Sequence, residues 1–93
     1  MCSLRENVWY VYILECEDGS YYTGLTKNVE RRFKAHMEGR GARHTQLKRP
    51  IGMKYFEAFF NRASAVRREF EIKRLEKKEK AHLIRFGSGR RFN

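Results

Sequence analysis

Five side chains in this 93-residue sequence are the candidates for catalysis, by their types and their spacing. They are Tyr12, Tyr22, Arg32, His36 and Glu69. Arginine stays charged at any working pH, tyrosine and histidine can exchange protons, and a carboxylate can bind a hard metal cation. Together these types suit acid–base chemistry on an anionic group. Whether the five side chains meet depends on the elements that carry them.

The two tyrosines fall in segments that read as neighbouring strands of a β-hairpin. Residues 8–14 and 20–26 are rich in β-branched and aromatic side chains, and residues 17–19 between them are Glu-Asp-Gly. A three-residue loop of this composition, with its glycine in the left-handed region, is common in hairpins. The register that follows sets Tyr12 opposite Gly24.

Alternation along these strands predicts two faces with different roles. One face is the candidate core and would carry Trp9, Val11, Ile13, Tyr21 and Leu25. The other face would carry Tyr10, Tyr12, Tyr22, Gly24 and Thr26. Tyr12 and Tyr22 then become diagonal neighbours, roughly 7 to 8 Å apart at the backbone, with open space at the glycine. A two-residue loop would instead put the tyrosines on opposite faces, so the loop decides whether they can act together.

Arg32 and His36 lie on a predicted helix that follows the second strand. Apolar side chains recur along it at Val29, Phe33 and Met37. Thr26 or Asn28 can cap its start, and the glycine-containing segment 39–41 would end it. Arg32 and His36 are four residues apart on a stripe beside the apolar one, so they should face the same neighbour.

Glu69 lies on a long helix that is predicted to begin at Asn61 or Ser64. It shares a row with Ala65 and Ile72, so small and apolar side chains flank its carboxylate. A partly buried carboxylate needs a specific reason to be there. Pairing with a lysine one helical turn later, at position 73, is the alternative to a functional role.

The remaining segments complete a small domain. They are an N-terminal extension over 1–7, a basic loop over 39–52, a third strand over 53–60, a final helix over 77–86 and a flexible basic tail over 87–93. One domain would therefore span residues 8–86. The expected architecture is α/β of the α+β type, with a small three-stranded antiparallel sheet flanked by about three helices.

The charge balance narrows the choice of partner. The chain has 21 Lys and Arg against 11 Asp and Glu, a formal net charge of +10. Phosphate neutralisation and counterion release favour nucleic acid as the partner. An anionic membrane surface is less favoured, because the basic residues are spread along the chain. A highly soluble basic surface with no specific partner is the alternative.

The sequence has no strong signal for membrane insertion, export or metal binding by its cysteines. The longest apolar run covers residues 8–14, which is too short for a membrane span, and the N-terminus lacks the apolar segment of a signal peptide. Cys2 and Cys16 do not have the spacing of metal ligands and, as free thiols, fit a reducing compartment. We therefore expect a cytoplasmic protein.

Taken together, these residues form a pattern that resembles the GIY-YIG nuclease domain. Its parts are Tyr10-Val11-Tyr12, Tyr22-Thr23-Gly24, Arg32, His36 and Glu69. The similarity runs from about Trp9 to Phe86 and looks closest to the small stand-alone bacterial members. Tyr10 and Thr23 replace a glycine and an isoleucine but suit a strand, and Leu25 stands where some members have a lysine.

The resemblance implies a GIY-YIG-like fold and hydrolysis of a phosphodiester bond with one divalent metal ion, Mg²⁺ or Mn²⁺. Glu69 would be the metal ligand, and Arg32 would hold a phosphate with two donors. Tyr12 is favoured as the general base, with Tyr22 orienting the water or the phosphate, although the two roles could be exchanged. His36 would relay a proton or hold the substrate.

Further basic residues would contact the nucleic acid, which is expected to be DNA. They are Lys27, Arg31, Arg40, Arg43, His44, Lys48 and Arg49. No segment resembles a recognition helix, so a DNA shape such as a flap, branch or nick, met in repair or recombination, is the expected target. Two alternatives stay open: a nucleic-acid-binding module that does not cut, and a nuclease module targeted by a protein partner. A pure binder would have no need of Glu69 beside a phosphate.

Overall fold

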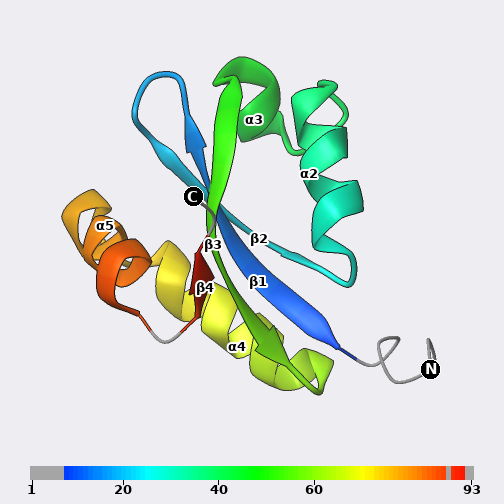
Figure 1. Ribbon diagram of the computed structural model, residues 1–93, viewed down its shortest axis with the longest axis vertical. Coiled ribbons are helices and arrows are strands. Elements are labelled where there is room, and N and C mark those ends of the chain that lie inside the picture. The colour runs from blue at the N-terminus through cyan, green and yellow to red at the C-terminus, as the bar shows by residue number, and fades with distance from the viewer. Residues whose placement is uncertain (1–7, 88, 92–93) are drawn as a thin grey trace.

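The computed structural model describes residues 8–87 and 89–91, and it contains one antiparallel sheet with helices on both faces (Figure 1). The sheet has the order β2-β1-β3-β4, with β1 at Trp9–Cys16, β2 at Tyr21–Thr26, β3 at Pro50–Phe59 and β4 at Arg90–Arg91. The helices are α2 at Val29–Met37, α3 at Arg43–Leu47, α4 at Arg62–Lys73 and α5 at Lys77–Phe86. Figure 1 shows α2 and α3 on one face and α4 and α5 on the other. The predicted α+β fold class is confirmed.

The β1–β2 hairpin has the predicted loop and register. Gly19 adopts a φ of 84°, and the Cys16 amide donates to the Ser20 carbonyl at 2.9 Å, which closes the loop over residues 17–19. Tyr12 lies opposite Gly24, and Tyr22 lies opposite Leu14. Tyr12 and Tyr22 therefore occupy the same face of the sheet.

Each face of the sheet has its own hydrophobic core. On the face of α4 and α5, the buried residues are Val11, Ile13, Tyr55, Ala65 and Ile72, with Trp9, Tyr21 and Leu25 packed against them as predicted. On the face of α2, the buried residues are Tyr12, Leu14 and Met53, with Tyr22, Val29, Phe33 and Phe56 around them. The tyrosine face is thus a second core, because the apolar row of α2 packs on it.

Asparagine side chains cap the two helices that carry the candidate site residues. The Asn28 side chain accepts from the Arg31 amide at 2.9 Å, and the Asn61 side chain accepts from the Ser64 amide at 2.8 Å. Of the alternatives that the sequence left open, Asn28 and Asn61 are the N-caps. These caps fix where α2 and α4 begin, and with that the direction in which each later side chain points.

The basic segment predicted as a loop over 39–52 is more ordered than expected. It contains the short helix α3, and β3 begins at Pro50 instead of residue 53. Two register irregularities in the β1–β3 pairing, at Ile13/Leu14 and at Glu15/Cys16, accompany this extension. Proline is tolerated at the first position of a strand because its missing N–H costs no ladder bond there.

The C-terminal segment also departs from the sequence prediction. Arg90 and Arg91 form β4, which pairs with Phe56 and Tyr55 of β3, where a flexible tail was expected. The predicted extension over 1–7 and tail residues 88, 92 and 93 lie outside the described residues. No helix in the described part of the chain is long and apolar enough to cross a bilayer.

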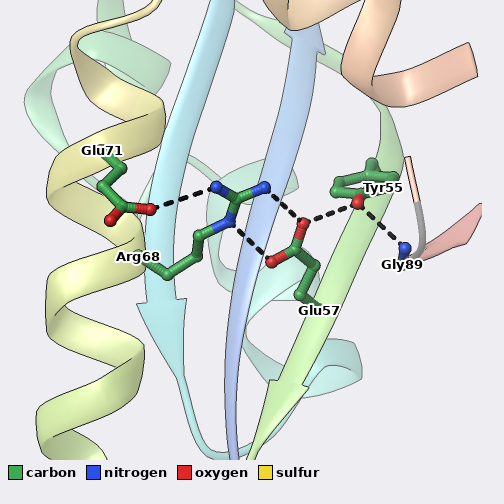
Figure 2. A network of polar contacts seen from close by, with 5 residues as sticks. All are labelled: Tyr55, Glu57, Arg68, Glu71 and Gly89. Atoms are coloured by element: carbon green, nitrogen blue, oxygen red, sulfur yellow. Dashed lines mark hydrogen bonds and ion pairs between the residues drawn. The ribbon is translucent and has the colours of Figure 1, made fainter. Parts of the chain in front are cut away.

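A polar network fastens α4 to β3 (Figure 2). The Arg68 guanidinium donates to both carboxylate oxygens of Glu57, at 2.8 and 3.0 Å, and to Glu71 at 3.1 Å. The Tyr55 hydroxyl donates to Glu57 at 2.6 Å and accepts from the Gly89 amide at 2.9 Å. Burial and the Glu57 carboxylate raise the pKa of Tyr55 to about 12. The network sets the rotation of α4 on the sheet and therefore the position of Glu69, the next residue along the helix.

Arg68→Met should lower the free energy of unfolding by about 1–3 kcal/mol, because it leaves the largely buried Glu57 carboxylate without its bidentate partner. Denaturant unfolding measures this change. Arg67→Met is the matched control, since Arg67 is exposed on the same helix, and it should change stability by less than about 0.5 kcal/mol. Equal losses in the two variants would remove the anchoring role of Arg68.

Candidate active site

The centre of the candidate site is a cluster of three aromatic rings between the sheet and α2. Tyr12 comes from β1, Tyr22 from β2 and His36 from α2. The ring centroids are 6.3 Å apart for Tyr12 and Tyr22, 5.7 Å for Tyr12 and His36, and 5.3 Å for Tyr22 and His36. Tyr12 and His36 are each 1% exposed, whereas Tyr22 is half-buried. Solvent therefore reaches the cluster through Tyr22.

Gly24 lets the ring of Tyr12 lie against the edge strand. A Cβ atom at position 24 would come within 2.3 Å of the Tyr12 hydroxyl oxygen, a distance that real Cβ contacts do not reach. The open space expected opposite Tyr12 is therefore filled by the ring of Tyr12 itself. Any side chain at this position would push the ring away from β2 and from α2.

The Tyr12 hydroxyl joins the strand to the helix through a short hydrogen bond. It lies 2.8 Å from Nε2 of His36, and Nδ1 of His36 lies 2.7 Å from the hydroxyl of Thr45. Burial raises the pKa of Tyr12 to about 12, against a lowering effect of Arg32. Burial, assisted by the charge of Arg32, lowers the pKa of His36 to about 4. Both side chains are thus neutral at physiological pH.

Arg32 brings the positive charge to this cluster. Its guanidinium lies within interaction range of the Tyr12 and Tyr22 hydroxyls, and the contact with Tyr12 is the largest cause of a raised pKa for Arg32. Arg32 lies one helical turn before His36, as the spacing predicted. The two tyrosines, Arg32 and His36 therefore converge on one point at the α2 face of the sheet.

Glu69 approaches from α4, on the other side of β2. Its side chain is 20% exposed and its carboxylate pairs with Lys73 Nζ at 3.2 Å. Its negative charge is also among the causes that raise the pKa of Tyr12, so the carboxylate lies within electrostatic reach of the cluster. The intrahelical pair that the sequence offered as an alternative role is thus present.

A metal ion would have one carboxylate to bind here. In the part of the chain that the structure describes, no group of three or more His, Cys, Asp and Glu side chains could hold an ion. Mg²⁺ is often bound by one or two carboxylates, with waters and substrate phosphate completing the octahedron. The partly exposed Glu69 fits a site of this open kind and does not fit a closed structural one.

The predicted nucleic-acid contacts are dispersed around this centre. Lys27 lies over the ring of Trp9, 5.0 Å from its centroid, and Arg62 approaches the same ring at 5.6 Å. Arg31 and Arg40 line a cavity of about 740 Å³ along α2, which Arg32 also lines.

Several of these basic residues already have acidic or polar partners. Arg40 forms an ion pair with Glu38, and Lys48 pairs with Asp18 at 3.3 Å. Arg43, the first residue of α3, and Arg49, between α3 and β3, are both exposed. These four basic residues are thus all at the surface, outside the buried part of the cluster.

His44 lies close to the cluster but is held differently from His36. Its ring centroid is 5.6 Å from that of Tyr22, and its Nε2 is 3.1 Å from the Ser20 hydroxyl. That hydroxyl is 2.6 Å from Asp18, a carboxylate that can only accept. Ser20 therefore donates to Asp18 and accepts from His44, so His44 does not activate Ser20 as a nucleophile.

Sequence reasoning missed two residues that complete the surroundings of His36. Thr45 is 2% exposed and contacts His36 from α3, and the backbone at Gly41 passes close to Nδ1 of the imidazole ring. Both fall in the segment that was expected to be a loop. No periodicity marks them, because their positions depend on how α3 folds back onto α2.

Comparison with known proteins relates this arrangement to a family. The GIY-YIG catalytic domain matches residues 8–82. A UPF0213 protein of Staphylococcus saprophyticus is 42% identical over 78 residues, which cover 84% of this chain and 95% of that protein. A UPF0213 protein of Clostridium perfringens is 49% identical over 75 residues, which cover 81% of each chain.

Two solved structures are similar in both sequence and fold. The solution NMR structure of a UPF0213 protein from Bacillus halodurans is 44% identical, with a TM-score of 0.54. The solution NMR structure of a protein from E. faecalis is 39% identical, with a TM-score of 0.58. Each covers 84% of this chain and 83% of the other. With a matching domain that spans all of the clustered residues, this chain belongs to the GIY-YIG family of nuclease domains.

Proposed function

We propose that this protein is a metal-dependent endonuclease that hydrolyses phosphodiester bonds in DNA. The observation that carries the proposal is the convergence of Tyr12, Tyr22 and His36 on Arg32, whose guanidinium lies within interaction range of both tyrosine hydroxyls. An arginine held in this way can present its remaining donors to a phosphate and neutralise charge as the pentavalent phosphorus forms. The tyrosines and the histidine then lie where the attacking water must be deprotonated.

Tyr12 is the proposed general base, acting together with His36. A hydroxyl with a pKa of about 12 is a poor base by itself. However, as the Tyr12 oxygen takes a proton from water, its own proton can pass to Nε2 of His36, 2.8 Å away. The net result is one proton moved from water to His36, with Tyr12 neutral before and after. Tyr22, at the solvent side, orients the water or the phosphate.

Glu69 is the residue that would hold the divalent cation, Mg²⁺ or Mn²⁺, which supplies Lewis-acid charge next to the phosphate when bound. Binding a cation there requires Glu69 to exchange or share its contact with Lys73. The released ammonium would remain close enough to attract the DNA backbone. The family supports a divalent-metal requirement in general terms, and the open carboxylate is compatible with it.

DNA binding is proposed to use the exposed basic residues. The net charge of +10 favours a polyanion, and Trp9 with its two flanking cations provides an aromatic and basic spot at the end of the hairpin. Contacts of this kind position the backbone without reading bases. We therefore propose selection of a DNA shape, such as a flap, branch or nick, in repair or recombination.

Two observations favour a second function. The Glu69–Lys73 pair and the buried Tyr12 hydroxyl suit a protein that binds nucleic acid without cutting it, or one that a protein partner activates. Tyrosines and basic side chains alone are sufficient for such binding. Cleavage and binding must therefore be measured on the same variants.

Glu69→Gln should abolish cutting and preserve DNA binding, because it removes the proposed metal ligand and one negative charge. A labelled panel of single-stranded, duplex, nicked, flapped and four-way-branched DNA, with Mg²⁺ or Mn²⁺ at fixed salt, measures both. Glu17→Gln, the same change on the exposed hairpin loop, is the matched control and should cut like the wild type. Undiminished cutting by Glu69→Gln would rule out the metal-ligand role. If the wild type and both variants bind DNA and none of them cuts it, the result would support a binding module.

The protonation of His36 gives a pH-dependent prediction. The pKa of this histidine is about 4 in the folded protein, against about 6.5 in an unfolded chain. Between these two pH values the histidine is protonated in the unfolded chain and neutral in the folded protein. The free energy of unfolding should therefore fall as the pH falls from about 6.5 to about 4, by on the order of 3 kcal/mol from this residue.

Denaturant unfolding across this pH range checks the effect, with His36→Gln as the variant in which the histidine contribution disappears. NMR titration of the His36 ring should show no protonation at pH 6. A ring that titrates near 6.5 would contradict the lowered pKa of His36 and remove its contribution to the fall in stability.

A further inference from the structure

The buried hydroxyl of Thr45 is a polar group with no role in the mechanism described so far. It lies on α3, 2% exposed, and it bridges two groups. Nδ1 of His36 is 2.7 Å from Thr45 Oγ1, and the carbonyl oxygen of Ala42 is 2.9 Å from the same atom. Thr45 therefore sits at the far side of the imidazole from Tyr12.

The chemistry of these partners fixes the direction of each hydrogen bond. A carbonyl oxygen only accepts, so the one hydroxyl proton of Thr45 is donated to Ala42. Thr45 Oγ1 must then accept from His36, which places the imidazole proton on Nδ1. Because His36 is neutral, Nε2 carries a lone pair and accepts from the Tyr12 hydroxyl at 2.8 Å. The hydrogen bonds run in one direction, from Tyr12 through His36 and Thr45 to the backbone.

The loop before α3 brings the backbone close to His36. A Cβ atom at Gly41 would come within 2.1 Å of Nδ1 of His36, so only a glycine allows the backbone to pass this close to the ring. The Arg40 amide donates to the Ala35 carbonyl at 2.8 Å, and the Gln46 side chain donates to the Gly41 carbonyl at 3.0 Å. The turn from α2 to α3 is thus fastened on both sides of Gly41.

We propose that Thr45 is a positioning residue that holds His36 in the tautomer with Nε2 free to accept the proton of Tyr12. In the opposite tautomer, Nε2–H would point at the Tyr12 oxygen, and Tyr12 could no longer pass its proton on. After the transfer, Nδ1–H of the imidazolium still donates to Thr45, so the same contact stabilises both states of the ring. The catalytic part of this proposal rests on the proposed nuclease function, whereas the tautomer part does not.

The experiment combines NMR with kinetics on wild type, Thr45→Val and Thr45→Ser. Long-range ¹H–¹⁵N spectra of the histidine rings at neutral pH report which nitrogen of His36 carries the proton. We expect Nδ1–H in wild type and in Thr45→Ser, and loss of that tautomer or a mixture in Thr45→Val. Cleavage by Thr45→Val should be slower by roughly 10- to 100-fold in kcat with little change in KM, and Thr45→Ser should recover most of it.

The two readouts separate this proposal from the nuclease function. A wild-type His36 protonated on Nε2, or an unchanged Nδ1–H tautomer in Thr45→Val, would overturn the role of Thr45 even if the protein cuts DNA. The expected tautomers together with an inactive wild type would support Thr45 and reject the nuclease function. If Thr45→Val does not fold, the spectra of wild type and Thr45→Ser still decide, because either one showing Nε2–H overturns the proposal.

Discussion

The close packing of the Tyr12 ring on Gly24 is the constraint on which the site depends. Because position 24 of β2 has no side chain, the Tyr12 ring can lie against this edge strand. Its hydroxyl then reaches α2, where it lies 2.8 Å from Nε2 of His36. The register of the hairpin sets this pairing, and the Glu-Asp-Gly loop sets the register. A slip of one residue would move Tyr12 into the opposite core, away from Arg32 and His36.

Burial gives this site its electrostatic character. Tyr12, His36 and Thr45 are all nearly inaccessible to water, so their hydrogen bonds form between neutral groups in a region of low dielectric constant. Burial raises the pKa of Tyr12, so almost no tyrosinate is present at neutral pH, and the proposed base action depends on the neighbouring neutral imidazole to accept the Tyr12 proton. Arg32 adds a fixed positive charge at the solvent side. In the proposed mechanism, the proton path therefore lies inside the second core and the phosphate contacts lie at the surface.

The parts of the structure that local signals determine could be predicted from the sequence. The hairpin loop, the side of the sheet shared by Tyr12 and Tyr22, and the adjacency of Arg32 and His36 follow from turn chemistry and periodicity. The parts set by tertiary packing could not be predicted. Helix α3 has five residues, and its position depends on the contact of Thr45 with His36. Strand β4 is a strand only through its pairing with β3. The burial of Tyr12 escaped prediction for the same reason, since it requires α2 to cover that face.

The central claim is that Tyr12 and His36 act as one unit in DNA cleavage, and a double-mutant cycle tests it most directly. Cleavage rate constants with Mg²⁺ would be measured for wild type, Tyr12→Phe, His36→Gln and the double variant, each checked for folding and DNA binding. Residues that act as a unit show strongly non-additive losses. If Tyr12 and His36 act as one unit, the double variant should cut no more slowly than the slower single variant. Losses that multiply, or single variants that cut like the wild type, would contradict it.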